Sequence, residues 1–151
     1  MRAQFLSTIA LVVMLIAITT SPGHSQKYKP GTLQHLAINN AGHEATECAA
    51  YHAVVGGVLK GDKREPHLSE KYLKTGTLLL ERAAILATMI DQKAAAIIAR
   101  YKISIDEMMK AIDNSATNIS ILYSKYAYPC KAVVEKPDDR LRYWLKKAVE
   151  K

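Results

Sequence analysis

Apolar residues recur every three or four positions along most of the chain after residue 42, which is the spacing of one face of an α-helix. In the first such stretch the recurring positions are Ala45, Cys48, His52, Val55 and Leu59. We therefore predict a first helix over 43–59, ended by the polar sequence 61–66. Residues 26–42 are predicted to form a lead-in segment, with a break in the glycine-containing sequence 39–42.

The next apolar pattern is longer and predicts a second helix over 68–101. Its main stripe consists of Tyr72, Leu79, Ala83, Leu86, Ile90, Ala94, Ile97 and Tyr101. Residues 83–90 contain no charged side chain. A helix that is apolar nearly all round is buried on several sides, so we expect this second helix to be the central element of the core.

A third helix is predicted to begin at Ser104, because Ser104 and Glu107 have the spacing of a capping box. Its apolar positions alternate in steps of four and three, as in a coiled-coil seam. They are Ile105, Met109, Ile112, Ala116, Ile119, Tyr123 and Tyr126. Pro129 is predicted to stop this helix. The connection between the second and third predicted helices is short, which predicts that these two helices pack antiparallel.

A fourth helix is predicted after Lys136. Pro137 suits a first turn, and Asp138 and Asp139 complement the positive end of the helix dipole. The sequence shows no strand-like alternation of useful length. We therefore predict an all-α fold, a small four-helix bundle-like domain over 43–151 with a long central second helix and a heptad-patterned third helix.

The first residues have the layout of a secretory signal. Arg2 supplies a positive charge, residues 9–18 form a run of ten apolar residues, and residues 19–25 contain small polar residues and a proline. A membrane span needs about 20 apolar residues, so a membrane anchor is the weaker alternative. We predict a cleaved signal peptide over 1–25 and a mature protein in the periplasm or outside the cell.

The chain contains two cysteines, Cys48 and Cys130. In an exported protein a pair of cysteines favours a disulfide, and we predict that these two are joined. Closing a loop of this length stabilises the fold by roughly 4–5 kcal/mol in the chain-entropy description. A free or intermolecular thiol is the alternative.

Tyrosines gather near both cysteines, and they are the leading binding candidates. Tyr51 and His52 follow the first cysteine, while Tyr123, Tyr126 and Tyr128 precede the second. A disulfide would bring the two groups into one neighbourhood. Tyrosine combines an apolar body with a polar tip, which suits partly hydrated binding surfaces. The alternative is that Tyr123 and Tyr126, which lie on the predicted seam, simply fill the end of the bundle.

Candidates for metal binding or catalysis are few. His43 and Glu47 are four residues apart and form a two-ligand pattern for zinc or copper. The alternative is a first helical turn in which the helix N-terminus stabilises Glu44 and Glu47. Cys48 and His52 have the same spacing, but a disulfide would remove the thiolate. No covalent haem motif, nucleophile elbow, phosphate-binding loop or dinucleotide fingerprint occurs. We therefore predict no enzymatic activity and no cofactor.

The charge changes this interpretation little. The 21 Lys and Arg residues exceed the 14 Asp and Glu residues, which gives a net charge of +7, but they are scattered. We therefore predict no nucleic-acid partner. The densest basic group lies in the fourth helix opposite Trp144, and consists of Arg140, Arg142, Lys146, Lys147 and Lys151.

These observations lead to one main functional hypothesis and two alternatives. The main hypothesis is a non-enzymatic module that binds another exported or envelope protein, such as an inhibitor, an immunity protein or a stress-related factor. The first alternative is a helical bundle that binds a small ligand or a metal, which requires a cavity between the first and third helices or a third ligand near His43 and Glu47. The second is association with a membrane surface through the basic fourth helix.

Overall fold

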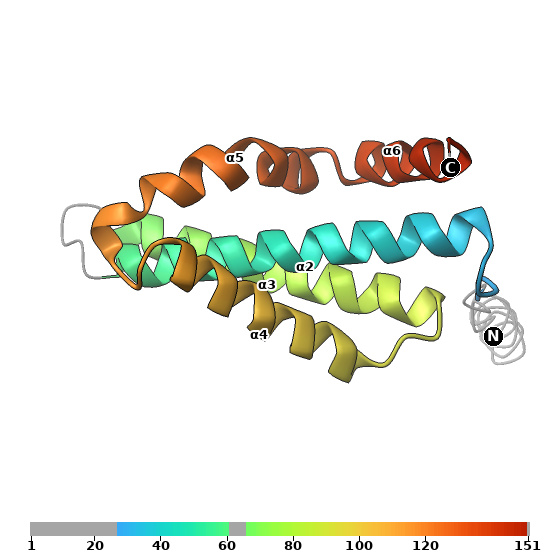
Figure 1. Cartoon of the computed structure of the whole chain (residues 1–151), viewed down its shortest axis with the longest axis horizontal. Helices are drawn as coiled ribbons and strands as arrows, with labels where there is room; N and C mark the ends of the chain where they lie inside the picture. Colours follow the sequence, from blue (N-terminus) through green and yellow to red (C-terminus); the bar gives the residue numbers. More distant parts are fainter. Residues whose placement is uncertain (1–26, 61–65, 151) are drawn as a thin grey trace, which may run out of the picture.

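The computed structural model describes residues 27–60 and 66–150, which form helices joined by short turns and contain no strand (Figure 1). The elements are α2 (Leu33–Leu59), α3 (Pro66–Met89), α4 (Ala94–Ala111), the short 3-10 helix η1 (Ala116–Asn118), α5 (Ser120–Glu135) and α6 (Pro137–Val149). The predicted all-α bundle is confirmed. The predicted signal peptide lies outside the described residues.

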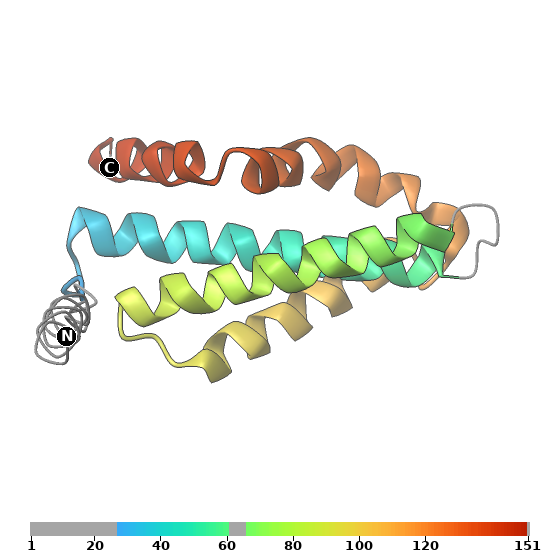
Figure 2. The ribbon, with the colours of Figure 1, turned by 180° about the vertical axis from the view of Figure 1, so that it is seen from behind.

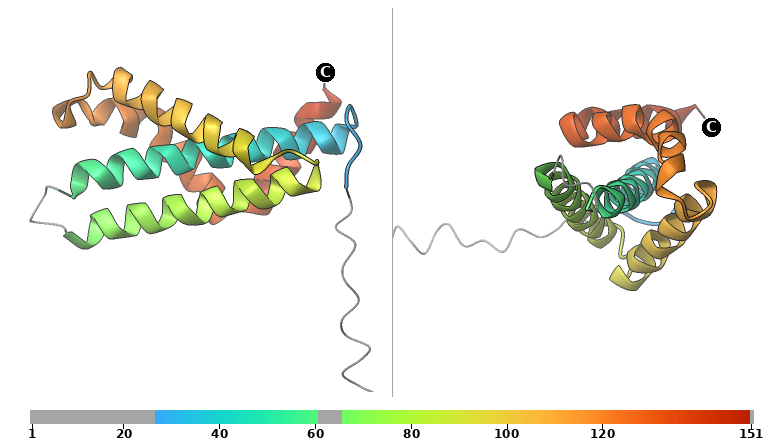
Figure 3. Two further views of the ribbon diagram at one scale, coloured as in Figure 1. Left: turned by 90° about the horizontal axis from the view of Figure 1, so that it is seen from below. Right: turned by 90° about the vertical axis from the view of Figure 1, so that its left-hand side faces the viewer.

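Helix α2 is the axis of the bundle. Seen end-on in Figure 3, it lies between α3, α4 and the pair formed by α5 and α6, and it packs most extensively against α3. The side chains that it buries are mostly small, and alanines such as Ala37, Ala45, Ala49 and Ala50 are at most 1% exposed. Small side chains allow neighbouring helices to approach α2 closely from several directions.

The predicted break at 39–42 is wrong, because α2 begins ten residues earlier than the predicted first helix. The side chain of Thr32 caps its N-terminus and accepts a hydrogen bond from the backbone N–H of His35 at 3.2 Å. Gly42 is buried, and a Cβ there would meet Leu86 of α3 at 3.8 Å. Packing against α3 therefore outweighs the weak helix propensity of the sequence 39–42.

The predicted long second helix is also wrong, because it is two helices. α3 ends at Met89, and α4 begins at Ala94 and runs back along the bundle (Figure 2). Asp91 adopts a left-handed φ of 55°, and the N–H of Gln92 donates to the carbonyl of Ala87 at 2.9 Å. This is the hydrogen-bond pattern of a Schellman helix end, with aspartate in the place where glycine is more common.

The predicted third helix is divided as well. Ser104 does not begin a helix but lies buried inside α4. After Ile112 the chain turns through Asp113 and Asn114, whose φ values are 52° and 54°, and α5 starts only at residue 120. The regular seam therefore contributes its first half to α4 and its second half to α5. Asparagine and aspartate tolerate the left-handed conformation better than other non-glycine residues, which explains where the turn falls.

Pro129 does not stop α5, contrary to the prediction; the helix continues to Glu135. Cys130 and Val133, directly after the proline, are buried in the main core. Their packing compensates for the hydrogen bond that proline cannot donate. The predicted fourth helix is confirmed as α6, which starts at Pro137.

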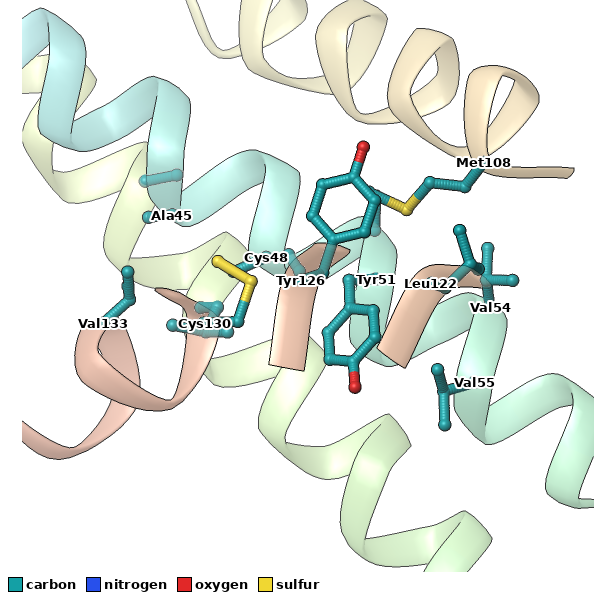
Figure 4. Close-up of a cluster of buried hydrophobic side chains, with 14 of the residues drawn as sticks. Ala45, Cys48, Tyr51, Val54, Val55, Met108, Leu122, Tyr126, Cys130 and Val133 are labelled. Atoms are coloured by element: carbon teal, nitrogen blue, oxygen red, sulfur yellow. A yellow bond between two sulfur atoms is a disulfide. The ribbon is translucent and has the colours of Figure 1, made fainter. Parts of the chain in front are cut away.

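The predicted disulfide between Cys48 and Cys130 is present and joins α2 to α5 inside the core (Figure 4). The two Cα atoms are 5.3 Å apart. Both residues are at most 2% exposed. The bond therefore fixes the position of α5 along α2 at the level of the core tyrosines.

Helix α6 is attached to α2 by a polar contact beside a small second core. Glu44 of α2 accepts hydrogen bonds from Arg140 Nε at 3.1 Å and from Trp144 Nε1 at 2.9 Å, and it also pairs with the terminal guanidinium nitrogen of Arg140. Trp144 packs against this second core, which consists of Ile38, Ala41, Leu86 and Ile90. Among residues 27–60 and 66–150, no helix is long and apolar enough to cross a membrane.

Two adjacent glycines in α2, Gly56 and Gly57, differ in how closely α3 approaches them. A Cβ at Gly56 would lie 2.8 Å from Leu73 Cγ and 3.2 Å from the Leu73 nitrogen, whereas one at Gly57 meets nothing within 4 Å. We expect Gly56→Ala to lower the free energy of unfolding by roughly 1–3 kcal/mol through overpacking. Gly57→Ala should raise it by about 0.5–1 kcal/mol because alanine favours the helix. Urea denaturation checks both, and equal stabilisation by the two variants would contradict the close contact.

Candidate binding pocket

The structure brings four of the five predicted binding residues together around Tyr51. The centroid of its ring lies 5.2 Å from that of His52, 6.4 Å from that of Tyr123 and 5.8 Å from that of Tyr126. Tyr128, by contrast, is 85% exposed on α5 and makes no ring contact with these residues. The disulfide thus assembles a cluster of aromatic rings from α2 and α5, and Tyr128 lies outside it.

Tyr51 forms the centre of the cluster and is only 2% exposed. Its hydroxyl is buried and has no hydrogen-bond partner among the described residues. Burial, followed by the nearby phenols of Tyr72 and Tyr123, raises the pKa of Tyr51 well above its ordinary value. After burial, the Tyr72 phenol is the neighbour that contributes most to the raised pKa of Tyr51. Tyr51 therefore stays an uncharged phenol.

Figure 4 shows that the hydroxyls of Tyr51 and Tyr126 point in opposite directions. The Tyr126 hydroxyl points toward Met108 of α4, whereas the Tyr51 hydroxyl points toward α3. The two buried tyrosine hydroxyls therefore lie on different sides of the core. Only the Tyr51 hydroxyl points to the side where the structure contains a pocket between α2, α3 and α5.

His52 lies beside Tyr51 and is half-buried. Its ring centroid is 5.1 Å from that of Tyr72, and the two rings are tilted by 40°. Its Nδ1 atom is buried and has no hydrogen-bond partner among the described residues. Burial lowers the pKa of His52 to about 4. The imidazole is therefore neutral near pH 7, and Nδ1 offers either a proton or a lone pair, depending on the tautomer.

These two residues line a pocket of about 390 Å³ between α2, α3 and α5, which we call the α2–α3–α5 pocket. Tyr51 and His52 form its inner end. Its remaining lining residues are Leu68, Lys71, Tyr72, Thr75, Ala127, Lys131, Val134 and Glu135. The charged members are exposed at the opening, where Lys131 Nζ lies 4.0 Å from Glu135 Oε1.

The spacing of α2 and α3 beside this pocket depends on glycine. A Cβ at Gly76 would lie 3.1 Å from the carbonyl oxygen of Ala49 and 3.3 Å from His52 Cβ. Ser69 adds a direct link between the helices, because its hydroxyl donates to the carbonyl of Gly56 at 2.7 Å. The close contacts on either side of Tyr72 therefore hold the pocket wall at a fixed distance from α2.

The predicted metal-binding pair, His43 and Glu47, lines a separate cavity of about 440 Å³ near α6. Within residues 27–60 and 66–150, no group of three histidine, cysteine or carboxylate side chains could hold a metal ion. The alternative metal site at Cys48 and His52 is wrong, because Cys48 is oxidised. The Glu44 carboxylate at this cavity is already bound by Arg140 and Trp144.

Tyr72 is the main pocket residue that sequence reasoning missed as a site residue. The sequence predicts it as part of the apolar stripe of the second helix. Leu68, Tyr72 and Thr75 follow helical spacing, so their common face was visible in the sequence. What was not visible is that this face of α3 lies opposite Tyr51 and His52, because that depends on how α3 packs against α2.

Comparison with protein-family models, curated proteins and solved structures returned no match for this chain.

The unpartnered hydroxyl of Tyr51 leads to a stability prediction. Removing a buried hydroxyl that lacks a partner removes a desolvation penalty, so we expect Tyr51→Phe to leave the free energy of unfolding unchanged or raise it by up to about 1 kcal/mol. Ser69→Ala is the matched control, because the Ser69 hydroxyl is buried but hydrogen-bonded. This variant should lose about 1 kcal/mol of unfolding free energy. Denaturant titration measures both. A loss for Tyr51→Phe as large as that for Ser69→Ala would show that the Tyr51 hydroxyl has a structural partner.

Proposed function

We propose that this chain is a non-enzymatic exported protein that binds a small ligand in the α2–α3–α5 pocket. The observation that carries the proposal is that Tyr51 and His52 both line one pocket, and that each has a buried polar atom without a hydrogen-bond partner among the described residues. A ligand-binding bundle requires a cavity between its helices, and the α2–α3–α5 pocket is such a cavity.

A residue with a purely structural role at position 51 would need no hydroxyl. More than about 90% of buried polar groups in proteins have a hydrogen-bond partner, and an unsatisfied one costs roughly 1–3 kcal/mol. Phenylalanine would fill the space of Tyr51 without this penalty. A ligand that hydrogen-bonds to the phenol would recover the lost energy, and specificity in small-molecule sites commonly rests on a few such groups in an apolar pocket.

Export is supported by the sequence pattern of residues 1–25 together with the disulfide. Disulfides persist in oxidising compartments and are uncommon in reducing ones. The Cys48–Cys130 bond lies in the core, and it fixes α5, which forms one wall of the pocket. The oxidising location and the binding site are therefore linked through the same bond.

Binding to another exported protein is the second candidate, and the exposed apolar face of α5 favours it. Tyr128 is 85% exposed and Ile121 is 46% exposed. They are seven residues apart and so share one face of the helix. Exposed aromatic residues are common anchors in protein interfaces. This face is distinct from the pocket, so the two candidates are separable by experiment.

Membrane association through α6 has less support than its sequence suggested. Arg140, part of the predicted basic face, instead binds Glu44. Arg142 and Lys147 pair with acidic neighbours on α6, at 3.5 Å from Asp139 and 2.6 Å from Glu150. The helix therefore presents fewer unpaired cations to an anionic surface than the sequence indicated.

The proposal is tested by a fragment screen followed by NMR. We expect hits to shift the amide signals of Tyr51, His52 and Tyr72. Ala127→Trp places a large side chain at the pocket and should weaken these hits by about tenfold or more, an energy of roughly 1.4 kcal/mol. Ala99→Trp, at an exposed position on α4, is the matched control and should change nothing. Hits that are insensitive to Ala127→Trp, or that shift signals on α5 around Tyr128 only, would contradict the proposal.

A further inference from the structure

The lining of the α2–α3–α5 pocket changes in character from its inner end to its opening, and this order defines a ligand. We infer that the ligand has an uncharged hydrogen-bonding group at its buried end, a flat apolar body in the middle and an anionic group at the opening. This inference rests on the proposed function and deepens it, because it assigns the chemistry and the orientation of the occupant.

The inner end requires an uncharged polar group. Tyr51 Oη can donate one hydrogen bond and accept others, and Nδ1 of neutral His52 supplies one further donor or acceptor. No charged side chain lines the pocket at this end; its charged lining residues are the exposed Lys71, Lys131 and Glu135. Burying a charge without a partner is far more costly than burying a hydroxyl or a carbonyl that is hydrogen-bonded. A phenol, an alcohol, a ketone or an amide therefore fits, and a carboxylate or an ammonium group does not.

The middle of the pocket is aromatic and aliphatic. The rings of His52 and Tyr72 lie 5.1 Å apart with a tilt of 40°. Leu68 supplies aliphatic surface from α3, and the exposed Val134 of α5 adds aliphatic surface nearer the opening. Rings in offset or edge-to-face contact gain more than their buried area alone provides. A flat ring is therefore a better match for this section than a branched polar group.

The opening is electropositive. Its charged lining residues are two lysines, Lys71 and Lys131, and one carboxylate, Glu135. Glu135 lies 4.0 Å from Lys131, and Lys71 forms no ion pair with a described residue. An anionic group on the ligand would lie near Lys71 while remaining solvated. Because the lysine is exposed, this contact adds little affinity, but it sets which end of the ligand enters first.

Three small probes separate these features. They are para-hydroxyphenylpropanoate, phenylpropanoate, which lacks the hydroxyl, and para-hydroxyphenylpropanamide, which lacks the charge. Binding is followed by NMR titration of the disulfide-bonded protein. We expect the hydroxyl to improve Kd roughly fivefold, the value of one hydrogen bond between neutral groups. We expect the carboxylate to improve it roughly twofold at low salt, as for an exposed ion pair.

Two pairs of variants assign the effects to residues. Tyr51→Phe should abolish the preference for the hydroxyl, so that para-hydroxyphenylpropanoate and phenylpropanoate bind this variant with similar Kd. Tyr126→Phe, which removes a buried phenol on the opposite side of the core, should keep the preference. Lys71→Gln should abolish the preference for the carboxylate over the amide. Lys74→Gln, at an exposed position on the same helix outside the pocket, should keep it.

The outcomes distinguish this inference from the proposed function. Equal binding of the hydroxylated and unhydroxylated probes by the wild-type protein would overturn the inferred chemistry, even if Tyr51→Phe failed to fold. Failure of all three probes, while other fragments still bind at the pocket, would overturn the ligand class but not the binding site. If neither the probes nor any fragment bound there, the proposed function itself would fail. A hydroxyl preference that Tyr51→Phe removes would support both.

Discussion

The structure depends on the burial of one helix, α2, on nearly all of its sides. Four other helices pack against it, so its buried side chains lie on several faces of the helix and most of them must be small. This constraint explains why Ala49 and Gly56 lie where α3 approaches most closely. It also explains why the segment 33–42, despite its polar and glycine-containing sequence, extends the helix. Close packing around α2 thus determines the positions of the surrounding helices.

The pocket follows from an exception to that rule. Tyr51 is a large side chain on a helix whose other buried residues are mostly small, and it lies one turn after Cys48. The disulfide holds α5 at this level of α2, so the phenol is enclosed by α3 on one side and α5 on the other. A bulky residue between closely spaced helices keeps them apart locally, and the space beside Tyr51 is the α2–α3–α5 pocket. The disulfide therefore positions one wall of the pocket as well as stabilising the fold.

Local chemistry predicted some features well and others poorly. The start of α6 at Pro137 and the disulfide both followed from residue types whose preferences are strong. The division of the predicted second helix was missed because no glycine or proline marks the turn, and Asp91 takes the left-handed position instead. The capping-box pattern at Ser104 failed because the same residues fit the interior of α4. Tyr51 and His52 were found as candidates from their proximity to Cys48, but Tyr72 and the pocket itself depend on the packing of α3, which single-sequence periodicity does not contain.

The central claim is that Tyr51 and His52 form the polar inner end of a site for an oriented small molecule. Intermolecular NOEs between isotope-labelled protein and unlabelled para-hydroxyphenylpropanoate test it most directly, because they report both location and direction. The account predicts NOEs from the ring protons beside the hydroxyl to the rings of Tyr51 and Tyr72, and from the methylene protons beside the carboxylate to the side chain of Lys71. NOEs to Val58 and Ile105 in the groove between α2 and α4, or a reversed orientation in the pocket, would contradict it.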